Sequence, residues 1–167
     1  MATEYALSAE ELEAPPVVPE WVLFSCGDRK FGAPLAISRE VVPPQPLTRL
    51  PGCGPAVAGL MGLRGRVITV FDMGVVLGLS PSRLVEDHRT LVLEHGKRTI
   101  GVLVDGIHGI AHGFGAVLSE PPSSMGELDA IRSDVVGVGT QGVITYYALA
   151  CDRILDRLLA DDGVSEG

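Results

Sequence analysis

The chain has 167 residues, 46% of them hydrophobic, and a formal net charge of −8 with a pI near 4.9. This length suits one domain with a sizeable core, and this hydrophobic content excludes general disorder. The negative charge, without any large basic cluster, argues against nucleic acid and anionic membranes as partners. With 21 glycines and 12 prolines, the chain must turn often between short elements, which favours an all-β fold with little helix.

The three cysteines are widely spaced, without a CxxC or Cys/His pattern, which indicates reduced thiols and no metal site. We find neither a signal peptide nor an apolar run of the roughly 18 residues that a membrane span needs. We therefore expect a cytoplasmic protein without cofactors. Residues 1–19 are interpreted as a mobile leader, residues 20–160 as the folded domain, and residues 161–167 as an acidic tail.

The folded part begins with a predicted β-hairpin, in which residues 21–25 and 29–35 flank a Gly-Asp turn. Residues 37–42 continue with apolar positions around a charged pair, and the prolines that follow predict an extended connector. A proline at the start of residues 55–59 predicts a short helical turn there.

The stretch GLMGLRGRVITVFDM, residues 59–73, is the most informative part of the sequence. Residues 66–71 are apolar on both faces, which predicts a strand buried between two layers. Asp72 then suits the N-cap of a short helix over residues 73–77. Arg64 lies at the mouth of this strand, where an arginine is either paired with a carboxylate or available to a partner.

Residues 80–88 are polar, and we expect them to join two lobes near residues 80–89. A second hairpin is predicted from residues 90–94 and 98–104, with a third short strand at 107–111. Asp105 and the glycine after it provide the turn between them.

Residues 113–134 are rich in Gly, Pro and Ser and predict a long loop with one short strand near Val117. Residues 135–139 and 143–149 should pair as strands. Residues 150–160 have an apolar stripe, which predicts a helix that docks on the β core.

The tripeptide Val-Ile-Thr occurs at residues 67–69 and again at 143–145, each time before a helical segment. Together with two hairpin-rich halves, this repeat is consistent with two similar small β-barrels that share a core.

Two motifs suggest ligands but lack the context that a ligand site needs. Residues 137–142 match GxGxxG, yet a strand follows where a dinucleotide site requires a helix, so we interpret them as a hairpin turn. His108 and His112 have helical spacing for a metal, but the glycines around them disfavour a helix.

No serine or cysteine lies in a nucleophile motif. Asp72 and Asp105 both follow predicted strands and could form a paired-carboxylate acid/base site, although capping and turn formation also explain them. A small carboxylate-dependent enzyme is therefore an alternative to a binding protein.

Several motifs in fixed order, namely FxxGxxxFGxPLxxxxEV, GLMGLRGRVITVFDM and TLVLEHGKRTIGVLVDGIHGI, give the chain a resemblance to the CheW-like family of chemotaxis coupling proteins. The resemblance covers about residues 21–158. It implies two five-stranded SH3-like barrels and a non-enzymatic adaptor. Its expected partners are the cytoplasmic tip of a chemoreceptor and the regulatory domain of a histidine autokinase, in arrays at the inner membrane.

The resemblance also implies site residues. Partner contacts are expected from Ile37, Glu40, Val41, Arg64 and Val67, whereas Gly65, Asp72 and Asp105 are expected to be structural. Gly62 and Thr69 stand where the family usually has Asn and Pro. A related adaptor of another signalling array, binding one or both partners, remains an alternative.

Overall fold

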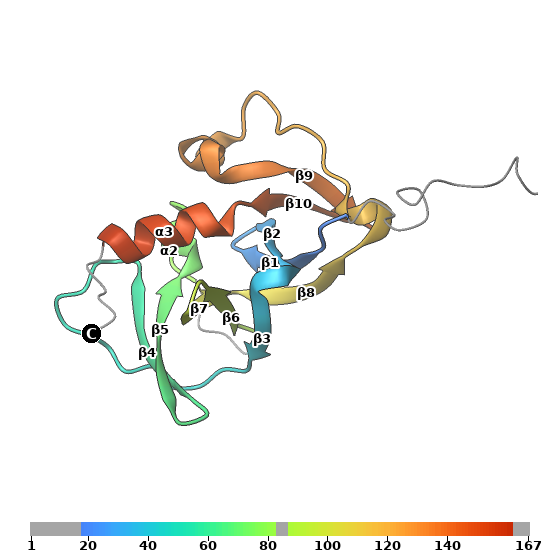
Figure 1. Cartoon of the computed structure of the whole chain (residues 1–167). Helices are drawn as coiled ribbons and strands as arrows, with labels where there is room; N and C mark the ends of the chain where they lie inside the picture. Colours follow the sequence, from blue (N-terminus) through green and yellow to red (C-terminus); the bar gives the residue numbers. More distant parts are fainter. Residues whose placement is uncertain (1–17, 83–86, 162–167) are drawn as a thin grey trace, which may run out of the picture.

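The computed structural model describes residues 18–82 and 87–161, and within them ten strands form two five-stranded sheets (Figure 1). The first sheet has the order β8-β1-β2-β10-β9, and the second has the order β3-β6-β7-β5-β4. The strands are β1 (Trp21–Cys26), β2 (Arg29–Pro34), β3 (Ser38–Val42), β4 (Val57–Leu63), β5 (Arg66–Asp72), β6 (Arg89–His95), β7 (Arg98–Val104), β8 (Gly106–Ala111), β9 (Val135–Gln141) and β10 (Ile144–Leu149). The expected all-β fold of two five-stranded units is therefore confirmed.

Helices are few and short. The described helical segments are α2 (Met73–Val76), α3 (Cys151–Asp161), η2 (Leu35–Ile37), η3 (Gly113–Ala116) and η4 (Gly126–Asp134). The leader expected over residues 1–19 lies outside the described residues except for its last two, and the tail after Asp161 lies outside them altogether.

The predicted hairpins are confirmed. β1 pairs with β2, β6 with β7, and β9 with β10, all antiparallel. Each sheet also contains one parallel pair, β5 with β7 and β10 with β2, and each of β5 and β10 leads into a helix. The two Val-Ile-Thr segments thus lie at corresponding places in two similar units.

Two expectations about the first half of the chain were wrong. Residues 57–59 are strand and not a helical turn, because β4 pairs along its length with β5. The buried part of β5 begins only at Ile68, because β5 pairs with β7 from Val70 onward and its first residues project beyond that neighbour. Val67 is accordingly 70% exposed.

The connection between the lobes was also misplaced. The residues described on both sides of the 80–89 segment lead from α2 to β6, and β5 and β6 belong to the same sheet. The chain instead crosses between the sheets at η2, and returns at Asp105 between β7 and β8. Both crossings are short, which holds the two barrels together.

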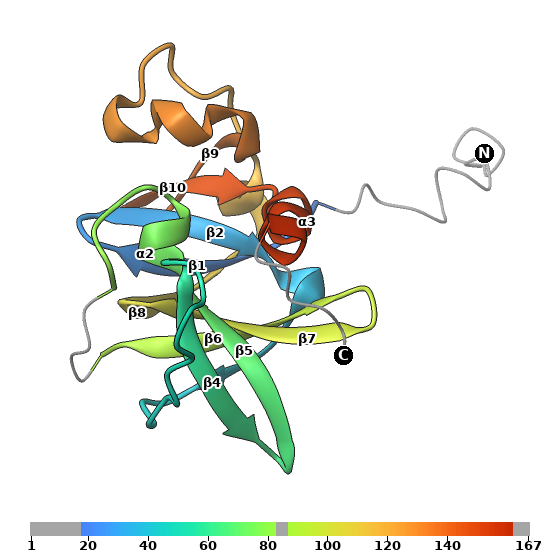
Figure 2. The ribbon, with the colours of Figure 1, turned by 90° about the vertical axis from the view of Figure 1, so that its left-hand side faces the viewer.

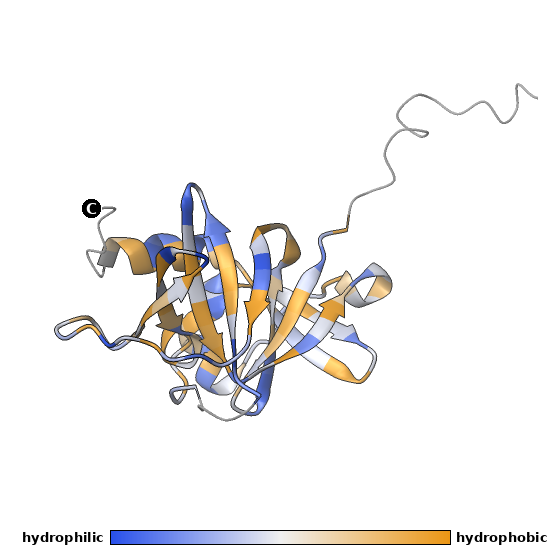
Figure 3. Ribbon diagram, turned by 90° about the horizontal axis from the view of Figure 1, so that it is seen from below, coloured by the Kyte–Doolittle hydropathy of each residue, from blue (hydrophilic) through white to orange (hydrophobic). Residues whose placement is uncertain are grey.

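The core has three parts. Trp21, Leu23 and Tyr146 belong to a cluster inside the first barrel, and Met61 and Val92 to one inside the second. The largest cluster joins the two sheets and includes residues from α3. Hydrophobic and hydrophilic residues alternate along several strands (Figure 3), as strands with one buried face require.

The C-terminal helix docks on the β core, as predicted. Ile154 and Leu155 of α3 are buried in the shared core. Arg157 binds the buried carboxylate of Asp134 with Nη1 to Oδ1 at 2.9 Å, and Asp156 lies 2.6 Å from Nε2 of His95 on β6. Figure 1 shows α3 leaving β10 and lying over the second sheet, so this helix contacts both halves.

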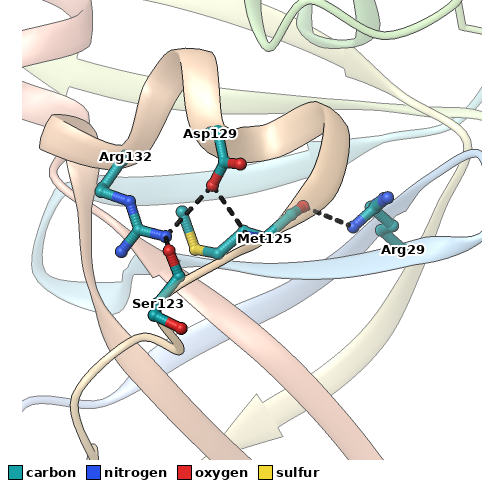
Figure 4. Close-up of polar contacts among 5 residues, drawn as sticks. All are labelled: Arg29, Ser123, Met125, Asp129 and Arg132. Carbon is teal, nitrogen blue, oxygen red and sulfur yellow. Dashed lines mark hydrogen bonds and ion pairs between the residues drawn. The ribbon is translucent and has the colours of Figure 1, made fainter.

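Within residues 113–134, where a long loop was expected, the structure has the two short helices η3 and η4 joined by a non-helical segment. The only pairing described near the predicted strand is an isolated bridge from Ser119 to Val138. Figure 4 shows how η4 is fixed: Asp129 accepts a hydrogen bond from the Met125 amide at 2.8 Å and one from Arg132 at 3.1 Å. Arg29 of β2 donates to the Met125 carbonyl, which ties η4 to the first sheet.

Candidate functional site

A projecting hairpin carries the most informative stretch of the sequence. β4 and β5 are joined by the two-residue turn Arg64-Gly65, and both residues have positive φ angles, 48° and 78°. Two such residues are typical of the tight turns that suit a twisted hairpin, and Gly65 adopts this conformation without steric cost. Figure 2 shows that the end of this hairpin extends beyond the rest of the second barrel, so Arg64 lies at an exposed tip.

An ion pair joins the tip of this hairpin to β3, which is the terminal strand of the second sheet opposite β4. Arg64 contacts Glu40 of β3 with two nitrogens, Nη2 to Oε1 at 2.9 Å and Nη1 to Oε2. Because β3 and β4 are the terminal strands of the second sheet, this pair bridges the opening of the barrel. The Arg64 side chain remains 74% exposed, so it is available to a partner as well.

A second ion pair lies beside the first. Arg39 of β3 donates to Glu94 of β6 from Nε at 3.0 Å and also from Nη2. This hydrogen bond, and then the charge of Arg39, lower the pKa of Glu94, and Arg66 adds a smaller lowering effect. We call Arg39, Glu40, Arg64, Arg66 and Glu94 together the charged rim.

The three apolar residues expected at the partner surface come from three different elements. Val67 is 70% exposed and Val41 is 40% exposed, but they lie on β5 and β3, which are not neighbours in the sheet. Ile37 lies in η2, where it is half-buried and packs against the shared core, and its role as a partner contact stays a prediction.

Sequence reasoning singled out Glu40 and Arg64 but missed the other three members of the charged rim. The sequence pattern that could have revealed Arg66 is a pair of arginines, Arg64 and Arg66, on either side of the turn glycine. Strand alternation places Arg66 on the face of Ile68 and Val70, which line the second barrel.

Comparison with protein families decides the identity of this fold. Residues 20–142 match the model of the CheW-like domain, which is most of the chain. The chain belongs to the CheW-like domain family.

Several CheW-like relatives have related sequences. The chain is 36% identical to Protein PilI of Pseudomonas aeruginosa over 89 residues, which are 53% of this chain and 50% of PilI. It is 26% identical to a probable chemotaxis protein CheW of Rhizobium etli over 110 residues, covering 66% of this chain and 71% of that protein. It is 30% identical to chemotaxis protein CheW of Rhizobium meliloti over 91 residues, covering 54% and 59%. The match thus spans only about half of PilI.

The fold has a solved counterpart. The scaffolding protein TtCheW from Thermoanaerobacter tengcongensis superposes with a TM-score of 0.71 over 85% of this chain and 90% of that one, at 21% identity. This likeness supports the two-barrel CheW-like architecture.

The two aspartates of the enzyme alternative have structural contacts in this CheW-like chain. Asp72 caps α2, accepting from the Val75 amide at 3.3 Å and from the Ser82 amide at 3.0 Å. Asp105 accepts from the Gly27 amide at 2.7 Å. Asp72 lines a cavity of about 680 Å³ beside α2, and Asp105 lines a different one of about 390 Å³, so no described cavity combines the two carboxylates.

The other candidate ligand motifs also have structural explanations. The GxGxxG residues lie in the β9–β10 hairpin, where Gly142 has a φ of 63° and Gly139 packs against the Tyr146 ring. His108 is on strand β8 and His112 follows it, so they do not share a helix face. Among the described residues, no group of three or more acidic, His or Cys side chains could hold a metal. None of the described helices is long and apolar enough to span a bilayer.

Proposed function

We propose that this chain is a non-enzymatic adaptor that couples a chemoreceptor to a histidine autokinase in bacterial signal transduction. The observation that carries this proposal is the CheW-like domain match over residues 20–142. The names of the two rhizobial relatives, which are chemotaxis proteins, and of the scaffolding protein TtCheW support a scaffold role. We place the protein in the cytoplasm beside receptor arrays.

The expected partners are the cytoplasmic tip of the receptor and the regulatory domain of the kinase. The charged rim and the exposed valines supply the two kinds of contact that such docking requires. Apolar contacts such as Val67 and Val41 contribute affinity, and charges such as Arg64 and Glu40 fix orientation. We assign Asp72, Asp105 and Gly65 to the architecture that holds this surface.

A second candidate is an adaptor of the same kind in another signalling array. The chain is 36% identical to PilI, which exceeds its 26% and 30% identities to the two rhizobial CheW proteins. Binding should therefore be tested with receptors and kinases from more than one signalling array.

Affinity purification from native cells, followed by titration of the pure chain with each receptor tip and kinase regulatory domain recovered, tests the proposal. We expect micromolar or tighter binding to both partner types. An Arg64→Glu variant with an intact fold should bind at least one of them more weakly, because it replaces the cation beside Glu40 by a second carboxylate. If the wild-type chain binds neither partner, the adaptor function is wrong.

A further inference from the structure

A small polar cavity lies where the chain crosses from β7 to β8. It has a volume of about 380 Å³, and its lining comes from β1, from β8 and from the start of β6 and the segment just before it. None of the five residues expected to contact partners lines this cavity. Its volume is at the lower end of the range for small-molecule sites, so a ligand there would be small.

Ser25 contributes a buried hydroxyl to this cavity. The residue is only 7% exposed, and no hydrogen bond joins its hydroxyl to any residue that the structure describes. Buried hydroxyl groups nearly always have a partner, because an unsatisfied one has lost its hydrogen bonds to water without replacement. The Ser25 hydroxyl is therefore suited to bind a molecule in the cavity.

Gly106 makes room at the same place because it has no side chain. A methyl carbon on Gly106 would lie 3.4 Å from Oγ of Ser25, 3.6 Å from Nε2 of His108 and 3.8 Å from the carbonyl oxygen of Asp87. Apart from the two chain neighbours of Gly106, these are the nearest atoms. Three polar atoms from three segments therefore surround one open point.

Cations lie at this point as well. Ser25 is opposite Lys30 in the β1–β2 pair and opposite Gly106 in the β1–β8 pair. Residues directly opposite each other on antiparallel strands have their side chains on the same face of the sheet, so the Lys30 ammonium and the Ser25 hydroxyl are neighbours. Arg89 also lines the cavity, and its Nη1 donates to the His88 carbonyl at 2.7 Å. The Lys30 and Ser25 pair suits the carboxylate of a ligand.

The cavity also contains several acceptors. Asp87 and Asp105 supply carboxylates, and the Asp87 carbonyl oxygen is one of the three polar atoms at the open point. Partial burial, and then the charge of Lys30, lowers the pKa of His108 against a smaller opposing effect of Asp87. The imidazole is therefore neutral at pH 7, and one of its nitrogens can accept a hydrogen bond. These acceptors suit the ammonium group of a ligand.

We propose that this cavity binds a small zwitterion of the α-amino acid class, with its carboxylate at Lys30 and Ser25 and its ammonium group at Asp87. A ligand with one charge of each sign matches a lining that contains both carboxylates and cations. An amine alone would be repelled by Lys30, and a carboxylic acid alone would be repelled by the two aspartates. The inference goes beyond the adaptor function, because it gives this chain a soluble ligand.

The experiment titrates the full-length chain with the protein amino acids, one at a time, by isothermal titration calorimetry at pH 7.5. We expect a Kd of about 1 mM or tighter for at least one of them, which suits a ligand of few heavy atoms. Two analogues of the best ligand test the zwitterion. The amine without its carboxylate and the carboxylic acid without its ammonium group should each bind at least about tenfold more weakly.

Gly106→Ala tests the position of the site. Gly106 has no positive φ, and its added methyl would make only ordinary contacts, so the variant should fold while the methyl fills the open point. We expect its Kd to rise at least about tenfold. Gly62→Ala is the matched control, because its methyl meets nothing within 4 Å, and it should leave the Kd unchanged.

Ser25→Ala tests the hydroxyl. It should raise the Kd about tenfold, because it removes a hydrogen bond to a charged group of the ligand. It should not lower the melting temperature, since no described residue loses a hydrogen bond with the hydroxyl. Circular dichroism establishes that each variant is folded. If Gly106→Ala does not fold, an unchanged Kd in Ser25→Ala overturns the assignment.

Three other results would also overturn it. These are the absence of binding by every amino acid to the wild-type chain, equal Kd values for Gly106→Ala and Gly62→Ala, and an amine or carboxylic acid that binds as tightly as the amino acid. The adaptor function is tested separately, with the receptor tip and the kinase regulatory domain. Either proposal can therefore fail while the other stands.

Discussion

Arg64, at the tip of the β4–β5 hairpin, and Glu40, on β3, form a two-contact ion pair that joins the terminal strands of the second sheet. The Glu40 carboxylate is the more enclosed partner, at 26% side-chain exposure against 74% for Arg64. The pair therefore has two possible roles, closing the barrel and presenting a charge to a partner, and mutations can separate them.

The first prediction concerns the exchange of these two charges. Arg64→Glu and Glu40→Arg alone should each lower the melting temperature slightly, by about 2 °C, because exposed ion pairs stabilise little. The double variant should regain the wild-type melting temperature, since the opposite charges face each other again. Partner binding should stay impaired, because the charge at the tip is reversed. Restored binding in the double variant would show that only barrel closure matters.

The second prediction concerns a close approach inside the first barrel. A methyl group at Gly139 would lie 2.4 Å from the hydroxyl oxygen of the buried Tyr146, which itself donates to the Gly115 carbonyl at 2.5 Å. Gly139→Ala should therefore destabilise the fold by about 2 kcal/mol, measured by urea denaturation. Gly62→Ala is the control, because nothing lies within 4 Å of its added methyl group. Equal stability of the two variants would contradict this packing.

The third prediction concerns acid stability. Hydrogen bonds from the Met125 amide and from Arg132 lower the pKa of Asp129 below its ordinary value. A lowered pKa in the folded state stabilises the protein above the ordinary Asp range, and this contribution is lost as the pH falls through the folded-state value. The melting temperature of wild type should exceed that of Asp129→Asn at pH 6, and the gap should narrow towards pH 3. A gap that is constant over this range would exclude the effect.

The fourth prediction concerns thiol reactivity. Cys53 is exposed, whereas Cys26 and Cys151 are buried. Burial, assisted by Asp105 and Asp72, raises the pKa of Cys26, and burial, assisted by Asp152 and Asp134, raises the pKa of Cys151 to about 12. Because the thiolate is the reactive form, a maleimide at pH 7.5 should label only Cys53 quickly in the native chain. All three cysteines should react after denaturation. Mass spectrometry identifies the site, and rapid native labelling of Cys151 would contradict the buried environment.

The sequence alone determined the local features of this protein. The strands of the three hairpins, the turn glycines and the cap at Asp72 were all predictable, because alternation, turn chemistry and capping act between residues a few positions apart. The ordered motifs also sufficed to suggest the family to which the chain belongs.

Only the tertiary structure decided the features that depend on pairing between distant strands. The first residues of β4 were interpreted as a helical turn because a proline precedes them, and only their pairing with β5 makes them a strand. The crossing points between the barrels, and the partial burial of Ile37, likewise follow from strand order.

The charged rim shows the same division most clearly. Sequence placed Arg64 at the mouth of a strand and left open whether it pairs with a carboxylate or meets a partner. Arg64 and Glu40 are 24 positions apart, and Arg39 and Glu94 are 55 apart, so only the folded sheet brings them together. Those two pairings engage both carboxylates of the charged rim, and the part of the chain that the structure describes gives Arg66 no carboxylate partner, which no local pattern could reveal.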